Sequence, residues 1–95
     1  NLVHFIFDSE SHESTGGQPT NSSEIKLEKI AHVTKFKTFK VSTKYQIKKI
    51  IPKIKKESGP ILVLVKVSKS GAKSTRVDIS PPNIKNRFMK SLKQK

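Results

Sequence analysis

The sequence predicts an α/β protein in which strands and helices alternate and the strands form one parallel sheet with flanking helices. Short apolar runs rich in β-branched residues alternate with segments whose apolar residues recur at helical spacing. The chain has 95 residues, which is enough for one small domain, and its lack of cysteine excludes a disulfide scaffold. An order of strand, helix, strand, helix, strand, helix implies right-handed crossovers between parallel strands.

The first strand and the first helix are expected between residues 2 and 34. The apolar run 2–7, closed by Asp8, predicts a strand buried on both faces, with His4 packed in the core. Asn21 to Ser23 offer side-chain oxygens that can cap free backbone N–H groups, so we expect a helix to begin there. The apolar face of this helix is expected to consist of Leu27, Ile30, Ala31 and Thr34.

A second strand and helix are expected between residues 38 and 60. Residues 38–42 alternate in polarity, and Ser42 and Thr43 can cap a following helix. Pro52 lies inside that helix and removes one of its hydrogen bonds, so a kink or a helix restarting at Pro52 is the alternative. Gly59 ends the segment. The inward face is expected to hold Ile47, Ile50, Ile51 and Ile54.

The last strand and the last helix follow Pro60. Residues 61–67 are apolar on both faces until Lys66, as in a central parallel strand. Ser80 and Pro81 form an N-cap followed by proline at the first helical position. The inner face of this helix is then expected to consist of Ile84, Phe88 and Leu92.

The charge of the chain is strongly basic and unevenly distributed. The formal net charge is +13, yet residues 1–25 carry four acidic and no basic residues. A basic nucleic-acid-binding module is the alternative from a different class. The composition argues against this alternative, because 18 of the 20 bases are lysine, interleaved with isoleucine at helical spacing, whereas base readout favours arginine. No apolar run is long enough to span a membrane, and the absence of cysteine agrees with a cytoplasmic location.

The candidate site is the polar loop that follows the first strand. In parallel sheets, ligands bind beyond the carboxyl ends of the strands. The loop offers carboxylate and hydroxyl oxygens, the ligands that Mg²⁺ prefers, and its two glycines allow close approach of a ligand and N–H groups facing an anion. An ordinary acidic surface loop is the alternative interpretation. The oxygen-bearing and glycine positions are Asp8, Ser9, Ser11, Gly16 and Gly17.

Three acid–base candidates lie in the same loop. His12 is the one histidine whose position favours a function, because His4 is expected in the core and His32 on an exposed helix face. Glu10 and Glu13 offer an acid–base pair, although the sequence does not fix their geometry.

Three segments resemble a known family. Residues 1–20, which include His-Glu-Ser-Thr-Gly-Gly-Gln at 12–18, are similar to the cofactor-diphosphate domain of thiamine-diphosphate-dependent 2-oxo acid decarboxylases. The similarity is greatest to the phosphonopyruvate and sulfopyruvate decarboxylases. Residues 58–67 resemble the last core strand of that domain, and Arg76, Ser80, Pro81 and residues 85–89 resemble its C-terminal arm and helix.

The resemblance implies roles for the loop residues. A Mg²⁺ ion ties the cofactor diphosphate to the protein in this family, and Ser9 and Ser11 stand at two metal-ligand positions, the second through its carbonyl oxygen. Ser9 replaces the usual asparagine, a departure that puts the metal affinity in question. Asp8, Gly16 and Gly17 would lie along the cofactor. His12 and Glu13 would lie near the reacting end, as catalytic residues acting on substrate or in proton transfer.

The resemblance also implies that residues 1–95 are the C-terminal portion of that domain. The family's Gly-Asp-Gly metal segment is not in this sequence. Its activating glutamate belongs to a pyrimidine-binding domain of the same or another subunit, so a homo-oligomer is expected. The implied enzyme is a carboxy-lyase that converts phosphonopyruvate to phosphonoacetaldehyde and carbon dioxide, or acts on sulfopyruvate. We expect this chain alone to be inactive and to bind thiamine diphosphate weakly; a non-catalytic remnant is the alternative.

Overall fold

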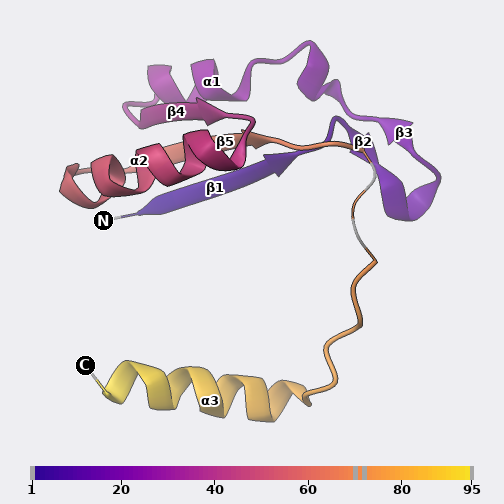
Figure 1. Cartoon of the computed structure of the whole chain (residues 1–95), viewed down its shortest axis with the longest axis vertical. Coiled ribbons are helices and arrows are strands. Elements are labelled where there is room, and N and C mark those ends of the chain that lie inside the picture. The colour runs from indigo at the N-terminus through magenta and orange to yellow at the C-terminus, as the bar shows by residue number, and fades with distance from the viewer. Residues whose placement is uncertain (1, 70, 72, 95) are drawn as a thin grey trace.

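The computed structural model describes residues 2–69, 71 and 73–94 and has a three-stranded parallel sheet (Figure 1). The strands are β1 (Val3–Asp8), β4 (Lys37–Val41) and β5 (Ile61–Lys66), in the spatial order β1–β5–β4. Both neighbours of β5 run parallel to it, with Val3 and Lys37 opposite Ile61. The prediction of an α/β fold with a parallel sheet is therefore confirmed.

The central strand β5 is the most buried part of the molecule. Its residues 61–65 are all buried, and the exposed fraction of Val63 is 0%. Since alternate side chains of a strand point to opposite faces, both faces of β5 must be covered. The sequence-based prediction of a central strand at this position is confirmed.

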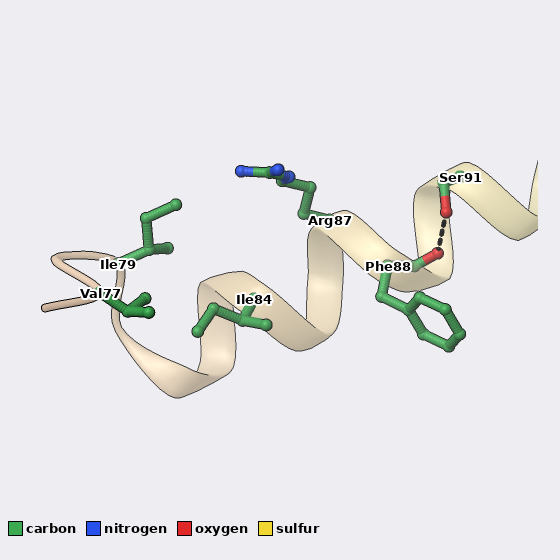
Figure 2. Close-up of a pocket in the computed structure, with 6 residues that line it drawn as sticks. All are labelled: Val77, Ile79, Ile84, Arg87, Phe88 and Ser91. Atoms are coloured by element: carbon green, nitrogen blue, oxygen red, sulfur yellow. Dashed lines mark hydrogen bonds between the residues drawn. The ribbon is translucent and has the colours of Figure 1, made fainter. Parts of the chain in front are cut away.

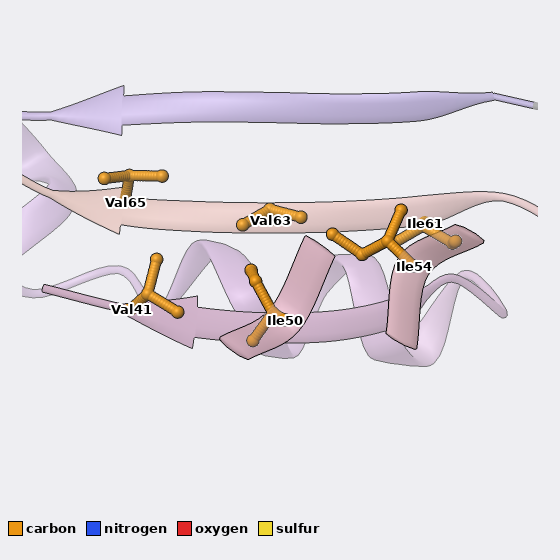
Figure 3. Close-up of a cluster of buried hydrophobic side chains, with 6 residues drawn as sticks. All are labelled: Val41, Ile50, Ile54, Ile61, Val63 and Val65. Atoms are coloured by element: carbon orange, nitrogen blue, oxygen red, sulfur yellow. The ribbon is translucent and has the colours of Figure 1, made fainter. Parts of the chain in front are cut away.

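Helices α1 (Leu27–Val33) and α2 (Lys44–Lys56) cover opposite faces of the sheet. On the α1 face, Ala31 packs with Leu62 and Leu64. Burial of these apolar groups contributes roughly 25 cal/mol per Å² removed from water. The cluster on the α2 face is shown in Figure 3 and consists of Val41, Ile50, Ile54, Ile61, Val63 and Val65.

Helix α2 begins with a capping box. The hydroxyl of Thr43 accepts a hydrogen bond from the Gln46 N–H, and the Gln46 side chain accepts one from the Thr43 N–H, both at 3.2 Å. These bonds satisfy backbone donors that an uncapped helix leaves free. The helix then continues through Pro52 to Lys56 as one element, so a restart at Pro52 is not seen.

The prediction that the first strand is buried on both faces is wrong. Strand β1 lies at an edge of the sheet, where Phe7 is 67% exposed, and the expected core residue His4 is exposed. The cause is the strand order: β5 takes the central position between β1 and β4, although it comes last along the chain. Among the described residues, β5 is the only strand that pairs with β1.

The prediction that a helix begins at Asn21 is also wrong. Residues Asn21–Ser23 form one 3-10 turn, η2, and α1 begins only at Leu27. Thr20 caps the turn by accepting from the Ser22 N–H, and the Ser22 hydroxyl turns toward Asp8. One of the expected cap residues, Ser22, is therefore used in a tertiary contact.

Helix α3 (Pro81–Lys93) begins with Ser80 as the N-cap and Pro81 as the first residue, as expected. It stands apart from the sheet (Figure 1) and contains no buried residue. The expectation that Ile84, Phe88 and Leu92 form an inner face is wrong, because all three are exposed. Both faces of β5 are already covered by α1 and α2, so the central strand offers α3 no open face.

Within the described part of the chain, no helix combines the length and the apolar content that crossing a bilayer requires.

Candidate functional site

The predicted loop lies beyond the carboxyl end of β1 and folds into a small hairpin. Strands β2 (Ser11–His12) and β3 (Gln18–Pro19) pair antiparallel, and the 3-10 turn η1 (Glu13–Thr15) lies between them. The chain turns into the hairpin at Glu10, whose φ of 59° is left-handed. The loop therefore has defined local structure at the edge where parallel sheets bind ligands.

Asp8 is the anchor of the loop. Its carboxylate accepts hydrogen bonds from the Lys66 ammonium at 2.7 Å, the Ser22 hydroxyl at 2.7 Å and the Glu10 N–H at 2.9 Å. Lys66 also lies 2.6 Å from the Glu10 carboxylate. Asp8 is only 8% exposed, and a buried carboxylate is costly unless its oxygens are paired in this way. The network fastens the loop to the end of β5.

The network keeps its charges at neutral pH. Burial acts to raise the pKa of Asp8, but the hydrogen bonds from Lys66, Ser22 and the Glu10 N–H and the charge of Lys66 outweigh it, and the pKa is lowered. The pKa of Lys66 is raised, mainly by its hydrogen bond to Asp8 and next by its hydrogen bond to Glu10. The carboxylate and the ammonium therefore remain ionised over the ordinary range of pH.

The structure brings the two predicted metal-ligand positions together. The Ser9 hydroxyl donates to the Ser11 carbonyl oxygen over 3.2 Å. Octahedral Mg²⁺ with ligands at about 2.1 Å places neighbouring ligand oxygens about 3 Å apart, so this pair has a suitable spacing. Binding would require the Ser9 proton to turn away from Ser11. The described residues contain no group of three His, Cys, Asp or Glu side chains placed to hold a metal, so further ligands would be water or diphosphate oxygens.

The catalytic candidates His12 and Glu13 lie at the tip of the loop, and both are exposed. The His12 carbonyl accepts a hydrogen bond from the Gly17 N–H at 2.8 Å, so its backbone helps to close the hairpin. Glu10, the expected partner of Glu13, is paired with Lys66 instead. The tip thus offers side chains to a ligand approaching from outside the chain.

The glycines serve the turn. Gly16 and Gly17 have φ values of 120° and 81°, which residues with a side chain rarely adopt. Both N–H groups donate within the loop, to the carbonyls of Glu13 and His12. The expectation that these N–H groups face an anion therefore has no support in the geometry.

Sequence reasoning missed Lys66 and Ser22 as members of the site. The sequence does mark Lys66, as the first charged residue after five apolar ones at the end of the predicted central strand. Its register with Asp8 is given only by the structure. For Ser22 the sequence pattern predicts a helix cap and gives no signal of a contact with Asp8. Both reach Asp8 through the tertiary fold, from 58 and 14 residues away.

An open apolar hollow lies elsewhere, on α3 and the stretch before it (Figure 2). It contains a single charged residue, Arg87, and no carboxylate, so it lacks the oxygen ligands of the loop. We therefore place the candidate site at the loop.

Fold and site together define a small α/β protein whose strand-end loop presents converging oxygen atoms beside an ion-paired lysine. Comparison with protein-family models, with curated proteins and with solved structures found no match.

Proposed function

We propose that this chain supplies the metal–diphosphate side of a thiamine-diphosphate-dependent 2-oxo acid decarboxylase. The observation that carries the proposal is the pair formed by the Ser9 hydroxyl and the Ser11 carbonyl oxygen, 3.2 Å apart beyond the end of β1. These are the two positions that the sequence resemblance assigns to Mg²⁺ ligation. The proposed substrate is an anionic 2-oxo acid, phosphonopyruvate or, within the same class, sulfopyruvate.

In this proposal each loop residue has one task. Ser9 and Ser11 hold Mg²⁺ against the diphosphate, while the Asp8–Lys66 pair fixes the strand end from which both residues project. Thiamine diphosphate, when bound, supplies a carbon nucleophile and an electron sink for loss of carbon dioxide. His12 and Glu13 project from the tip, where exposed side chains can contact a substrate carried by a neighbouring domain. Mg²⁺ in such sites commonly keeps water and substrate phosphate oxygens as its other ligands.

The decisive experiment is a nuclear magnetic resonance titration of the chain with Mg²⁺ and thiamine diphosphate, because this method detects weak binding. We expect Mg²⁺-dependent shifts of the Ser9 and Ser11 amide signals. Ser9→Ala should abolish these shifts by removing one oxygen ligand, and Ser9→Asn should strengthen them, since an amide oxygen is longer in reach and more polarised.

Ser23→Ala is the matched control, because Ser23 is an exposed serine in the neighbouring turn. It should leave the titration unchanged. Shifts confined to the lysine-rich helices, or equal shifts in Ser9→Ala and in the control, would contradict the proposal and indicate non-specific attraction of an anion to a basic chain.

A further inference from the structure

The outer face of helix α2 carries a dense group of positive charges, which we call the lysine face. All six lysines of the helix are exposed, and the helix contains no acidic residue. At 3.6 residues per turn they fall within about half of the helix circumference, opposite the buried Ile50 and Ile54. They extend over about 18 Å along the helix axis. The lysine face consists of Lys44, Lys48, Lys49, Lys53, Lys55 and Lys56.

These lysines have no carboxylate partner within the part of the chain that the structure describes. The ion pairs found there belong to Lys37, Lys40 and Lys66, which lie outside α2. Lysines four positions apart on a helix repel each other, as Lys49 and Lys53 do here. The helix therefore carries an electrostatic cost that an anionic partner along this face would relieve.

A partner of the lysine face must itself carry negative charges. An ordinary protein layer packed here would bury six ammonium groups, which is costly unless each of them meets an anion. A membrane surface fits less well, because a helix that binds in the membrane interface inserts apolar side chains. The four isoleucines of α2 are instead buried or half-buried within the protein. A linear polyanion, whose charges can follow the helix, fits best.

Tyr45 lies among the lysines and gives the face a second property. It is 65% exposed, and the Lys49 ammonium lies 4.7 Å from the centre of its ring. Proteins that bind single-stranded nucleic acids combine cations along the backbone with aromatic side chains on which bases stack. An exposed ring beside an ammonium group therefore matches a base and its phosphate.

We propose that the lysine face binds a single-stranded nucleic acid irrespective of sequence, with the lysines on the phosphates and Tyr45 stacked on a base. Lysine suits this task because its ammonium acts as a point charge toward phosphate oxygens. The scarcity of arginine argues against base readout, which this mode of binding does not use. The lysine face shares no residue with the proposed cofactor site, so either can exist without the other.

Fluorescence anisotropy of a labelled oligothymidylate, titrated with the full chain over a range of salt concentrations, tests the proposal. If all six lysines contact phosphates, the logarithm of the association constant should fall with that of the salt concentration with a slope of about −4. Lys49→Gln combined with Lys53→Gln should reduce this slope by about one-third and weaken binding by about tenfold at low salt.

Lys90→Gln combined with Lys93→Gln is the matched control. It removes the same charge from two exposed lysines of α3, and it should leave the salt slope unchanged. An equal loss of binding in the two double variants would show that net charge alone attracts the nucleic acid, and it would overturn the proposal.

Tyr45 provides a signal from the lysine face itself, because the chain has one tyrosine and no tryptophan. Its fluorescence, corrected for absorption by the nucleic acid, should be quenched as oligothymidylate binds to the wild type. Tyr45→Ala should raise the Kd by about tenfold, whereas Tyr45→Phe keeps an aromatic ring and should bind nearly as well as the wild type. Circular dichroism checks that each variant retains the helix content of the wild type.

Several other results would also overturn the proposal. They are an absence of binding at low salt, unchanged tyrosine fluorescence on binding, and equal affinities for Tyr45→Ala and the wild type. Duplex DNA, polyglutamate or vesicles containing phosphatidylserine that bind as tightly as the oligothymidylate would assign the lysine face to a different partner.

Discussion

Asp8 is the residue on which the loop depends most. It joins β1, η2 and β5 through one carboxylate, and three of its contacts come from different parts of the chain. Such convergence fixes the direction in which the chain leaves β1. The positions of Ser9 and Ser11 therefore depend on Asp8, which is not itself a proposed metal ligand.

Asp8→Asn should lower the free energy of unfolding by about 1–3 kcal/mol, because Lys66 loses its buried partner. In the wild type, the lowered pKa of Asp8 contributes stability above the pKa of the unfolded chain, and this contribution disappears as the pH falls through the lower folded value. The variant should therefore lose less stability on acidification. Urea unfolding at a series of pH values measures both effects.

Asp78→Asn is the control, since it removes the same charge from an exposed aspartate. Equal unfolding free energies for Asp8→Asn and the wild type at neutral pH would show that the network does not hold the loop.

At the scale of the element, the local sequence was sufficient to predict a helix or strand where the signal lies within the element itself. The start of α2 is fixed by Thr43 and Gln46, three positions apart, and β5 is recognisable from its continuous apolar run. The start of α1 was missed because Ser22 is engaged by Asp8, a contact that no local pattern reveals. The edge position of β1 was missed because strand order depends on tertiary packing.

Pro52→Ala should raise the free energy of unfolding by up to about 3 kcal/mol. Proline in a helix interior lacks the N–H that would bond to the carbonyl four residues earlier, and here the helix runs through it. Residue 52 is exposed, so the substitution leaves no cavity. Thermal unfolding followed by circular dichroism measures the change.

Lys53→Ala serves as the comparison, because it places alanine at a neighbouring exposed position without restoring a backbone donor. A gain of the same size in Lys53→Ala would attribute the effect to helix propensity or charge and contradict the backbone explanation.

At the scale of the molecule, stability resides in the sheet and two helices. A chain ending at Lys69 should unfold at the same temperature as residues 1–95 at low concentration, because no residue of α3 is buried. Differential scanning fluorimetry with an external dye tests this. A fall of several degrees on removal of α3 would mean that the helix packs on its own sheet.

The candidate site could be predicted from sequence only as far as it is local. Asp8 closes the first strand, and Ser9 and Ser11 follow it, so their position at the carboxyl end of the sheet was evident from the fold class. Lys66 could not be paired with Asp8 until β5 was known to lie beside β1. The N–H groups of both glycines donate within the hairpin. This too could not be predicted, because the shape of the turn does not follow from the sequence.

The left-handed backbone of Glu10 has a consequence for protein engineering. Glycine at this position would relieve a conformational cost of about 1 kcal/mol and would remove a partly exposed ion pair worth at most about the same. The two changes nearly cancel, so a screen for thermal stability would find almost no effect of glycine at position 10. Lys66, which fixes the end of β1, would nevertheless have lost one of its two ion pairs.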